Sequence, residues 1–289
     1  MQQDKPQLGV ILMITTMLIF AAQDGVSRHL AETYNTITVV MIRYWFFAVF
    51  VLVVSMIRSG GIRRVARSRR PFLQIFRSVL LVAEIFVMVT AFVRLGLVGS
   101  HAIFACFPLI VTALSMPILG EQVGWRRWTA VGVGFIGVLF ILRPGFQVFT
   151  LDVLIPLLAA VMFAFYHILT RMVAADDTAE TSFFWTGIAG AVAVTLVGPF
   201  FWEPMIGGDW YWMALLCVLS ALGHFLLIQA LTYAQASTIQ PFSYFQLVFA
   251  SLAGVVVFGE ALDQWTIVGG LVVVAAGLFA MLRQREVEG

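Results

Sequence analysis

The sequence predicts an all-α integral membrane protein with ten transmembrane helices arranged as two inverted five-helix repeats. Three observations support this fold class. Hydrophobic residues make up 61% of the 289-residue chain and charged residues only 11%, against about 45–50% and about 25% in ordinary soluble domains. Ten apolar runs are long enough to cross a bilayer, and a sequence pattern from the first half returns in the second. A water-soluble fold is therefore excluded.

Each predicted span is a mostly apolar run of about 20 residues, the length that crosses the hydrocarbon core of a bilayer. The ten runs cover residues 8–30, 35–57, 72–94, 99–119, 125–142, 152–172, 182–202, 210–232, 236–258 and 265–282. The first run follows Lys5 as the apolar part of a signal peptide would, but it lacks the small-residue cleavage pattern and is counted as a span. The longest polar stretch is 58–71, so no separate soluble domain is expected.

The placement of arginines predicts the orientation of the spans, because short cytoplasmic loops are enriched in Lys and Arg. The loop between the second and third spans carries six arginines, which places it and both chain termini in the cytoplasm. Twelve Lys and Arg residues then fall on the cytoplasmic side, and three, Arg28, Arg94 and Arg143, fall on the outer side. We attribute the basic loop to this topology rather than to binding of nucleic acid or anionic lipid.

The end of the first span has a close echo at an offset of 143 residues. The stretch "FAAQDGVSRHLA" (20–31) aligns without gaps with "FAFYHILTRMVA" (163–174). A second pair, "LGEQVGWRRWTAVG" (119–132) and "FGEALDQWTIVG" (258–269), aligns with a two-residue gap. The order of these markers is the same in both halves, so the chain is predicted to contain two copies of a five-span unit. Because five is odd, the copies enter the membrane in opposite senses.

The two predicted repeats are residues 1–146 and 147–289. Inverted repeats are a common plan of secondary transporters, in which the substrate binds near the midplane between the repeats. The sequence therefore predicts a transporter of small molecules that works within the lipid bilayer. Ten spans already contain both repeats, so a monomer is expected, with a dimer as the alternative. No cofactor, metal ion or nucleic-acid partner is expected.

Two stretches that end in Gly-Glu carry a resemblance to a known family. The segment "YAQASTIQPFSYFQLVFASLAGVVVFGE" (233–260) and its partner "GSHAIFACFPLIVTALSMPILGE" (99–121) resemble the signature of the EamA family of the drug/metabolite transporter superfamily. The resemblance covers essentially the whole chain and is greatest to ten-span bacterial amino-acid and metabolite exporters. It implies an efflux role in the bacterial inner membrane. The second half has "HILTR" where the first has "DGVSR", so no acid is implied at both equivalent positions.

Asp24 and Arg28 lie one helical turn apart near the outer end of the first span. Ionisable side chains inside a membrane are costly unless they are paired or face water, which makes each of them a functional candidate. Side chains at positions i and i+4 are neighbours on a helix. We expect this pair to neutralise itself and to seal the extracellular end of the span. Direct contact with the substrate is the alternative.

Glu84 lies near the middle of the third span, seven residues after Arg77. Arg77 is close enough to the cytoplasmic end of the span for its side chain to reach the membrane interface. Glu84 is not, so we expect it to face the protein interior and to pair with Arg43 of the second span. A static salt bridge, binding of a substrate amine and transfer of a proton are the roles left open for Glu84.

Three histidines, His101, His167 and His224, lie in or beside predicted spans. His167 takes the place of Asp24 in the second repeat and directly follows Tyr166, which joins it as a candidate substrate contact. A histidine inside a membrane either packs through hydrogen bonds or relays protons, and all three are kept as candidates. Their spacing fits no metal site. The two cysteines lie in apolar runs and are interpreted as buried side chains without a disulfide.

Uncharged polar residues are densest in the eighth and ninth spans. Gln240, Tyr244 and Gln246 are predicted to line the substrate cavity, and hydrogen bonding between helices is the alternative. Pro241 lies inside the ninth span and Pro108 inside the fourth, and a proline leaves a backbone carbonyl without its helical donor. Kinked helices at matching places in the two halves are predicted to form the binding site and its gates.

Two groups of residues are assigned structural roles only. The glycines of the fifth and tenth spans are interpreted as helix-packing faces, because small residues let helices approach closely. Glu121 and Glu260 are expected to cap or tie helix ends. The sequence contains no P-loop, HExxH or GxSxG motif, so ATP hydrolysis is not expected. A pore and an intramembrane enzyme that uses Glu84 with a histidine are disfavoured alternatives.

The sequence therefore predicts an alternating-access exporter of small metabolites, neutral and aromatic amino acids in particular. Amides, tyrosine hydroxyls and imidazoles supply the mixed donors and acceptors that a headgroup with both ammonium and carboxylate requires. Multidrug efflux of lipophilic cations is the alternative, because Glu84 among many aromatic side chains could bind such a cation.

Overall fold

The computed structural model describes residues 5–57, 61–142 and 151–259, together with 264–265, 267–269, 271–272 and 275–276. Secondary structure in these ranges is helical, without a strand. The α-helices are α1 (Pro6–Ala31), α2 (Thr36–Ile57), α3 (Ile62–Ala66), α4 (Pro71–Phe104), α5 (Phe107–Leu119), α6 (Trp125–Leu142), α7 (Leu154–Val173), α8 (Ala179–Val197), α9 (Asp209–Tyr233), α10 (Ala236–Ser243) and α11 (Phe245–Phe258). The predicted tenth span (265–282) lies largely outside the described residues, as does Glu260, so the count of ten spans stays a prediction.

Within the described ranges, seven helical stretches are long and apolar enough to cross a membrane. They are Pro6–Ala31, Thr36–Ile57, Pro71–Leu119, Leu151–Val173, Ala179–Phe201, Asp209–Tyr233 and Ala236–Phe258. The stretch Pro71–Leu119 has 49 residues and contains both the third and the fourth predicted spans. The predicted fifth span has the same bounds as α6.

Two helical segments meet inside α4 at Gly96, whose backbone is not helical, with φ 75° and ψ 175°. We expected the third span to end at residue 94 and the fourth to begin at residue 99, and this kink falls within that gap, although the connection is shorter than the predicted loop. Glycine adopts this conformation readily because it has no Cβ. Helical structure then resumes and breaks at Ala105 and Cys106, before α5 begins.

The predicted ninth span is likewise divided, into α10 and α11, which meet at Tyr244. Pro241 lies inside α10, and Pro108 lies in the first turn of α5. The sequence thus correctly places prolines beside two interrupted helices. The interruptions themselves fall at Ala105–Cys106 and at Tyr244 rather than at the prolines.

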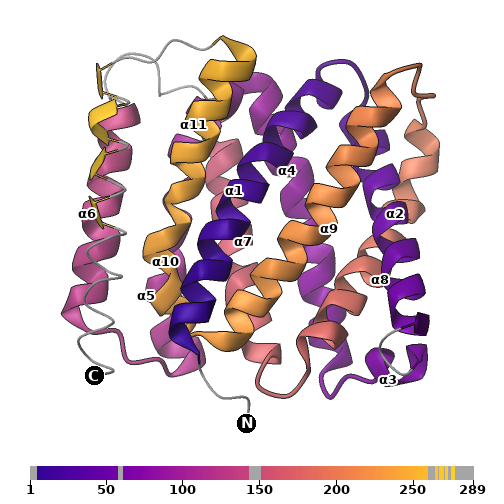
Figure 1. Ribbon diagram of the computed structural model, residues 1–289, viewed down its shortest axis with the longest axis horizontal. Helices are drawn as coiled ribbons and strands as arrows, with labels where there is room; N and C mark the ends of the chain where they lie inside the picture. The colour runs from indigo at the N-terminus through magenta and orange to yellow at the C-terminus, as the bar shows by residue number, and fades with distance from the viewer. Residues whose placement is uncertain are drawn as a thin grey trace.

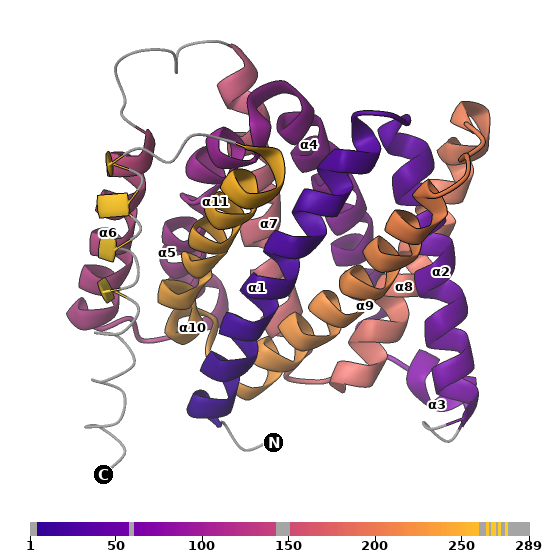
Figure 2. The ribbon, with the colours of Figure 1, turned by 45° about the horizontal axis from the view of Figure 1, so that its top comes forward.

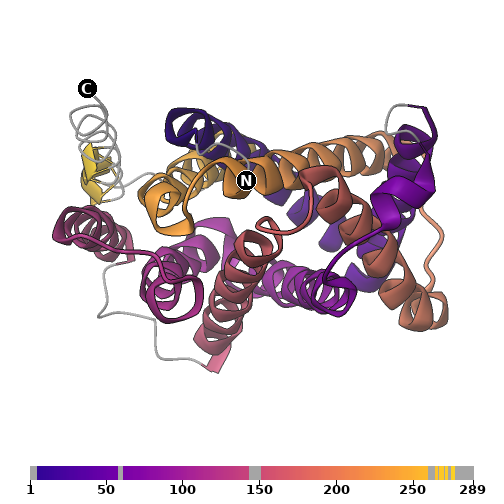
Figure 3. The ribbon, with the colours of Figure 1, turned by 90° about the horizontal axis from the view of Figure 1, so that it is seen from below.

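The helices form two facing layers (Figures 1–3). One layer contains α1, α9 and the α10–α11 pair, and the other contains α4, α5, α7 and α8; α6 lies at one edge and α2 with α3 at the other. Helices that are distant in the sequence pack against each other: α1 packs against α9, and α4 packs against α7. The beginning of α1 and the short helix α3 lie at the same end of the bundle (Figure 1).

Close approach of α1 and α9 depends on small residues at the contact. A Cβ atom added to Gly223 of α9 would lie 2.6 Å from the ring of Phe20. The distribution of polarity is the reverse of that in a soluble protein, since Phe72 is 88% exposed whereas Arg77 and Gln240 are fully buried. Apolar side chains on the outer faces and polar ones inside are typical of a protein that uses the bilayer as its solvent.

Candidate functional site: a charged cavity between the two layers

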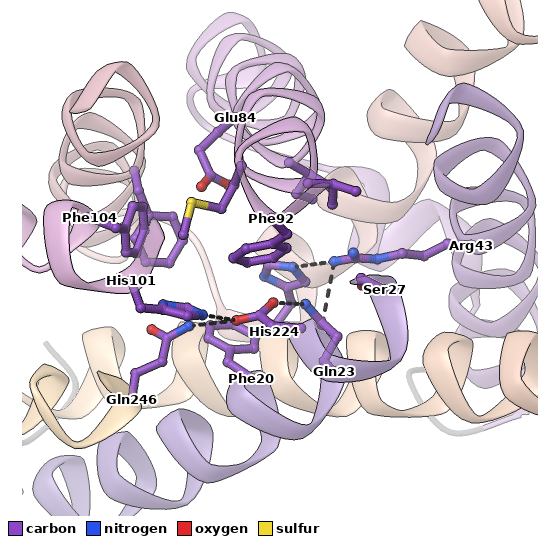
Figure 4. A pocket seen from close by; sticks show the side chains of 15 residues that line it. Phe20, Gln23, Ser27, Arg43, Glu84, Phe92, His101, Phe104, His224 and Gln246 are labelled. Carbon is purple, nitrogen blue, oxygen red and sulfur yellow. Dashed lines mark hydrogen bonds and ion pairs between the residues drawn. The ribbon is translucent and has the colours of Figure 1, made fainter. Parts of the chain in front are cut away.

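A small cavity of about 40 Å³ lies between the two layers of helices. Its charged and polar lining residues are Gln23, Asp24, Ser27, Arg43, Glu84, His101, His224 and Gln246 (Figure 4). Its apolar lining residues are Phe20, Ile85, Met88, Val89, Phe92, Phe104 and Phe163. These side chains come from α1, α2, α4, α7, α9 and α11. The cavity thus joins segments from both predicted repeats.

Asp24 links α1 to α4 and α11. The Gln246 Nε2 donates to the Asp24 Oδ2 over 3.0 Å, and the His101 Nε2 lies 3.2 Å from the same Asp24 oxygen. This second contact has the distance of an ion pair but not the alignment of a hydrogen bond. The Gln23 Nε2 donates to the other carboxylate oxygen over 3.4 Å. Asp24 is therefore a junction of three helices at the cavity wall.

The expected pair of Asp24 with Arg28 does not form. The Arg28 Nε donates to Glu32 over 2.9 Å, and its guanidinium carbon lies 4.3 Å from the centre of the Phe258 ring. The short Asp24 side chain turns into the cavity, whereas the long Arg28 side chain reaches along the helix toward its end. Spacing alone placed these two residues on one face, but tertiary partners decide where each points.

Arg43 is buried and bonded to uncharged groups. Its Nε donates to the Ser220 hydroxyl over 2.5 Å, its Nη2 lies 3.2 Å from the His224 Nε2, and the same Nη2 donates to Gln23 over 3.5 Å. None of the described carboxylates forms an ion pair with it. Ser220 and His224 are one turn apart on α9, so they present their polar atoms to the same guanidinium.

Glu84 lines the cavity from α4, as expected for an interior-facing carboxyl group (Figure 4). The predicted salt bridge to Arg43 is wrong, because the guanidinium is held by Ser220, His224 and Gln23 instead. Across the ranges that the structure describes, no side chain or backbone group donates a hydrogen bond to Glu84. The cavity therefore contains an acid without a cationic partner and an arginine without an anionic one.

Arg77 does not reach toward the membrane surface, contrary to expectation. It is fully buried, and its guanidinium donates to Gln74, Thr186, Thr170, Tyr166 and the backbone carbonyl of Ser182. These partners lie on α4, α7 and α8. Arg77 and Tyr166 therefore tie three helices together away from the cavity lining.

The remaining predicted site residues lie beside the cavity rather than in its wall. The His167 Nδ1 is 3.4 Å from the Gln240 amide nitrogen, so these two candidates do meet. Tyr244 points toward α6, where its hydroxyl donates to the backbone carbonyl of Val131 over 3.0 Å. Gln240 and Tyr244 were both predicted to line the cavity, but on either side of the break they have different neighbours, His167 for Gln240 and α6 for Tyr244.

Two residues that hold the charged side chains in place were missed by sequence reasoning. Gln23 bridges Asp24 and Arg43, and Ser220 holds Arg43, yet neither was singled out. The spacing of Ser220 four residues before His224 was a usable signal. Gln23 gave no distinctive signal in the sequence, because a polar residue next to a charged one in a helix can as easily point away from a site as into it. Among the described residues, no group of His, Cys, Asp and Glu side chains is arranged to hold a metal ion.

Ionisable side chains that converge on a cavity between membrane-spanning helices are typical of membrane transporters. The family model of the EamA-like transporter family matches residues 7–143 and 150–282, and the chain belongs to this family. The resemblance predicted from sequence is thereby confirmed. The chain is a multi-pass membrane protein and a small-molecule transporter, not an enzyme.

Three relatives illustrate the range of cargo in similar proteins. The S-adenosylmethionine uptake transporter of Rickettsia prowazekii is 27% identical, over 96% of this chain and 94% of its own. The riboflavin transporter of Vibrio cholerae is 28% identical over 88% of this chain and 86% of its own. The pseudopaline exporter of Pseudomonas aeruginosa is 24% identical over 93% of this chain and 94% of its own. A solved crystal structure with 17% identity, covering 97% of this chain and 99% of its own, has a TM-score of 0.77 and shares the fold.

Proposed function

We propose that the protein is a secondary transporter of metabolites that carry an amino-acid headgroup on an apolar or aromatic body. The observation that carries this proposal is the pair of opposite charges, Glu84 and Arg43, that line one cavity without forming an ion pair with each other. A buried charge without a partner is unfavourable by several kcal/mol. A substrate that brings both an ammonium and a carboxylate group satisfies both residues at once.

The assignment of groups follows from charge. The substrate ammonium binds at Glu84, in the cavity that Asp24 also lines, and the substrate carboxylate binds at Arg43, whose planar guanidinium suits a carboxylate. Four phenylalanines of the cavity wall, Phe20, Phe92, Phe104 and Phe163, contact the apolar body. Aromatic amino acids have this form, and S-adenosylmethionine, the cargo named for one relative, carries the same amino-acid headgroup on a body that ends in an aromatic adenine.

Alternating access is the proposed mechanism. Ligand sites for small molecules are about 300–1,000 Å³, whereas this cavity is about 40 Å³, so the helices around it must separate to admit a substrate. The two layers, each with one interrupted helix, supply the parts that move. The sequence expectation of export across the bacterial inner membrane, with both termini in the cytoplasm and a monomer as the transport unit, belongs to this proposal.

Efflux of lipophilic cations is a second candidate, favoured by one observation. Glu84 has no hydrogen-bond donor among the described residues and lies in a wall that also contains phenylalanine rings. A lipophilic cation would use Glu84 and the rings but would leave Arg43 without a role. The two candidates therefore differ in their dependence on Arg43.

Counterflow into proteoliposomes tests the proposal. Radiolabelled phenylalanine and S-adenosylmethionine are each offered to wild type, Glu84→Gln, Arg43→Gln and Gln246→Ala at equal reconstitution. We expect counterflow of at least one substrate, reduced about tenfold or more in Glu84→Gln and Arg43→Gln, the size of a lost charge-assisted hydrogen bond. Asp152→Asn is the matched control, because Asp152 pairs with Arg94 outside the cavity.

Competition by fragments of the substrate shows which residue binds the ammonium and which binds the carboxylate. Phenethylamine lacks the carboxylate and should inhibit wild type and Arg43→Gln alike but not Glu84→Gln, while phenylpropionate should show the opposite pattern. Absence of counterflow with both substrates contradicts the proposal. Movement of a lipophilic cation that needs Glu84 and tolerates Arg43→Gln would support the second candidate instead.

A further inference from the structure

A second hollow, unrelated to the substrate cavity, opens onto the bilayer between α2, α8 and α9. Its volume is about 420 Å³, and rings from all three helices form its wall, among them Phe50, Phe183 and Phe225. Phe50 is 39% exposed and Leu222 43% exposed, so the groove is open to the lipid-facing side. Its volume and its mostly apolar wall suit an acyl chain.

A charged hollow of about 460 Å³ adjoins this groove at the α3 end of the bundle. The two hollows share Val65 and Glu180 in their walls, so the apolar groove continues into the charged one. Val65 is buried, and the Trp185 indole donates to the backbone carbonyl of Ala66 over 3.2 Å. Helix α3 is therefore fixed in place beside both hollows.

The charged hollow presents ionic groups that lack partners. The side chains of Arg64, Arg67 and Arg69 line it, and within the described ranges none of them makes a hydrogen bond or an ion pair. The Glu180 carboxylate, at the junction of the two hollows, is likewise without an ion pair there. Asp177 differs, because the Ser68 hydroxyl, the Arg69 backbone amide and the Gln74 amide all donate to it.

We propose that the two hollows together bind one phosphatidylethanolamine molecule of the bilayer. An acyl chain lies in the groove between α2, α8 and α9, the phosphate lies at Arg64 and Arg67, and the ammonium lies at Glu180. Arginine binds phosphate oxygens through charge-assisted hydrogen bonds, and a primary ammonium donates to a carboxylate. The apolar groove opens onto a hollow that Glu180 lines at the junction and the arginines line beyond it, so one lipid can place a chain in the groove while its short headgroup contacts both the arginines and the acid.

Headgroup selectivity follows from Glu180. Phosphatidylcholine carries a quaternary nitrogen that has no N–H donor, and phosphatidylglycerol carries no cation. An anionic lipid would use the arginines but would be repelled by Glu180. The site is therefore selective for the amine and not for negative charge in general, which separates it from ordinary attraction of a basic loop to an anionic membrane surface.

Native mass spectrometry of the full-length protein tests this site. The protein is released from nanodiscs of equimolar dioleoyl phosphatidylethanolamine, phosphatidylcholine and phosphatidylglycerol, and the retained lipid is identified. We expect phosphatidylethanolamine to be retained about two- to fivefold over phosphatidylcholine, the size of one exposed ion pair. Glu180→Gln should remove this preference, and Glu180→Asp should keep it.

The arginines are tested in the same experiment. Arg64→Gln combined with Arg67→Gln should lower retention of all three lipids, while Arg63→Gln should not, because Arg63 lies on α3 but does not line the hollow. Equal retention of the two zwitterionic lipids by wild type would overturn the proposal. Enrichment of phosphatidylglycerol that Glu180→Gln leaves unchanged would overturn it as well. So would a loss of lipid retention in Arg63→Gln as large as that in the double variant of Arg64 and Arg67. None of these outcomes depends on which substrate is transported.

Discussion

Asp24 of α1 and His101 of α4 lie 3.2 Å apart at the cavity wall, and this contact has a counterpart in the second half of the chain. Asp24 corresponds to His167 at the 143-residue offset, and His101 corresponds to Gln240 at the 139-residue offset of the two Gly-Glu pairs. His167 and Gln240 lie 3.4 Å apart. The same two positions thus meet in each half, which supports the proposed repeat.

Helix ends give a second correspondence. The residue that follows α5 is Gly120, with φ 68°, and the residue that follows α11 is Gly259, with φ 66°, both in the left-handed conformation that favours glycine. Each of these helices follows an interruption of its span. The two halves differ, however, at the contacts Asp24–His101 and His167–Gln240, because Asp24 lines the cavity and His167 does not.

This difference predicts unequal effects of substitution at the two equivalent positions. Asp24→Asn should reduce counterflow about tenfold or more, because it removes the charge that holds His101 and Gln246 at the cavity wall. His167→Asn should reduce it clearly less, since His167 contacts Gln240 outside the cavity lining. Both variants are measured in proteoliposomes at equal protein content. An effect of His167→Asn as large as that of Asp24→Asn contradicts this view of the site.

Arg77 is expected to be structural. Arg77→Lys keeps the positive charge but cannot reproduce the planar fork that contacts α4, α7 and α8. Unsatisfied buried acceptors each destabilise by about 1–3 kcal/mol, so thermal stability in detergent should fall clearly. The stability of Arg63→Lys, on the exposed side of α3, should be unchanged. If Arg77→Lys kept its stability but changed which substrates compete, Arg77 would belong to the binding site.

Gly223 is predicted to set the position of a cavity ring. In Gly223→Ala the new methyl group would lie 2.6 Å from Phe20, so the ring must move. Overpacking of this kind destabilises by about 1–3 kcal/mol, and the displaced ring should raise the KM for transport. Gly132→Ala is the control, because no described atom lies within 4 Å of its added methyl group. Equal KM values for the two variants would show that Phe20 does not contact the substrate.

Hydropathy was sufficient to predict most of the fold. The helices α1, α2 and α9 begin and end within two residues of the predicted spans, because the need to keep backbone groups bonded in lipid leaves a long apolar run few alternatives to a helix. Glu84, His101, His224 and Gln246, which the sequence singled out on separate spans, line one cavity.

The pairing of charges could not be predicted in the same way. Asp24 was assigned to Arg28 by helical spacing and Glu84 to Arg43 by charge alone, and both assignments were wrong. The actual partners are uncharged or distant in sequence, such as Ser220 for Arg43 and Gln246 for Asp24. Spacing reports which residues share a face of one helix, whereas these contacts depend on how separate helices are placed against each other.

The bend at Gly96 is predicted to position His101 against Asp24. A residue other than glycine at φ 75° and ψ 175° destabilises by about 1–3 kcal/mol, so Gly96→Ala should either lower stability by this amount or force α4 to straighten. Straightening moves the segment that carries His101, and counterflow should fall with it. Gly99→Ala, where the added methyl group meets only Leu95 at 3.7 Å, should leave counterflow unchanged and stability equal or slightly higher. Thermal unfolding and counterflow are measured on the same preparations. Wild-type behaviour of Gly96→Ala in both measurements would mean that the bend does not hold the two residues together.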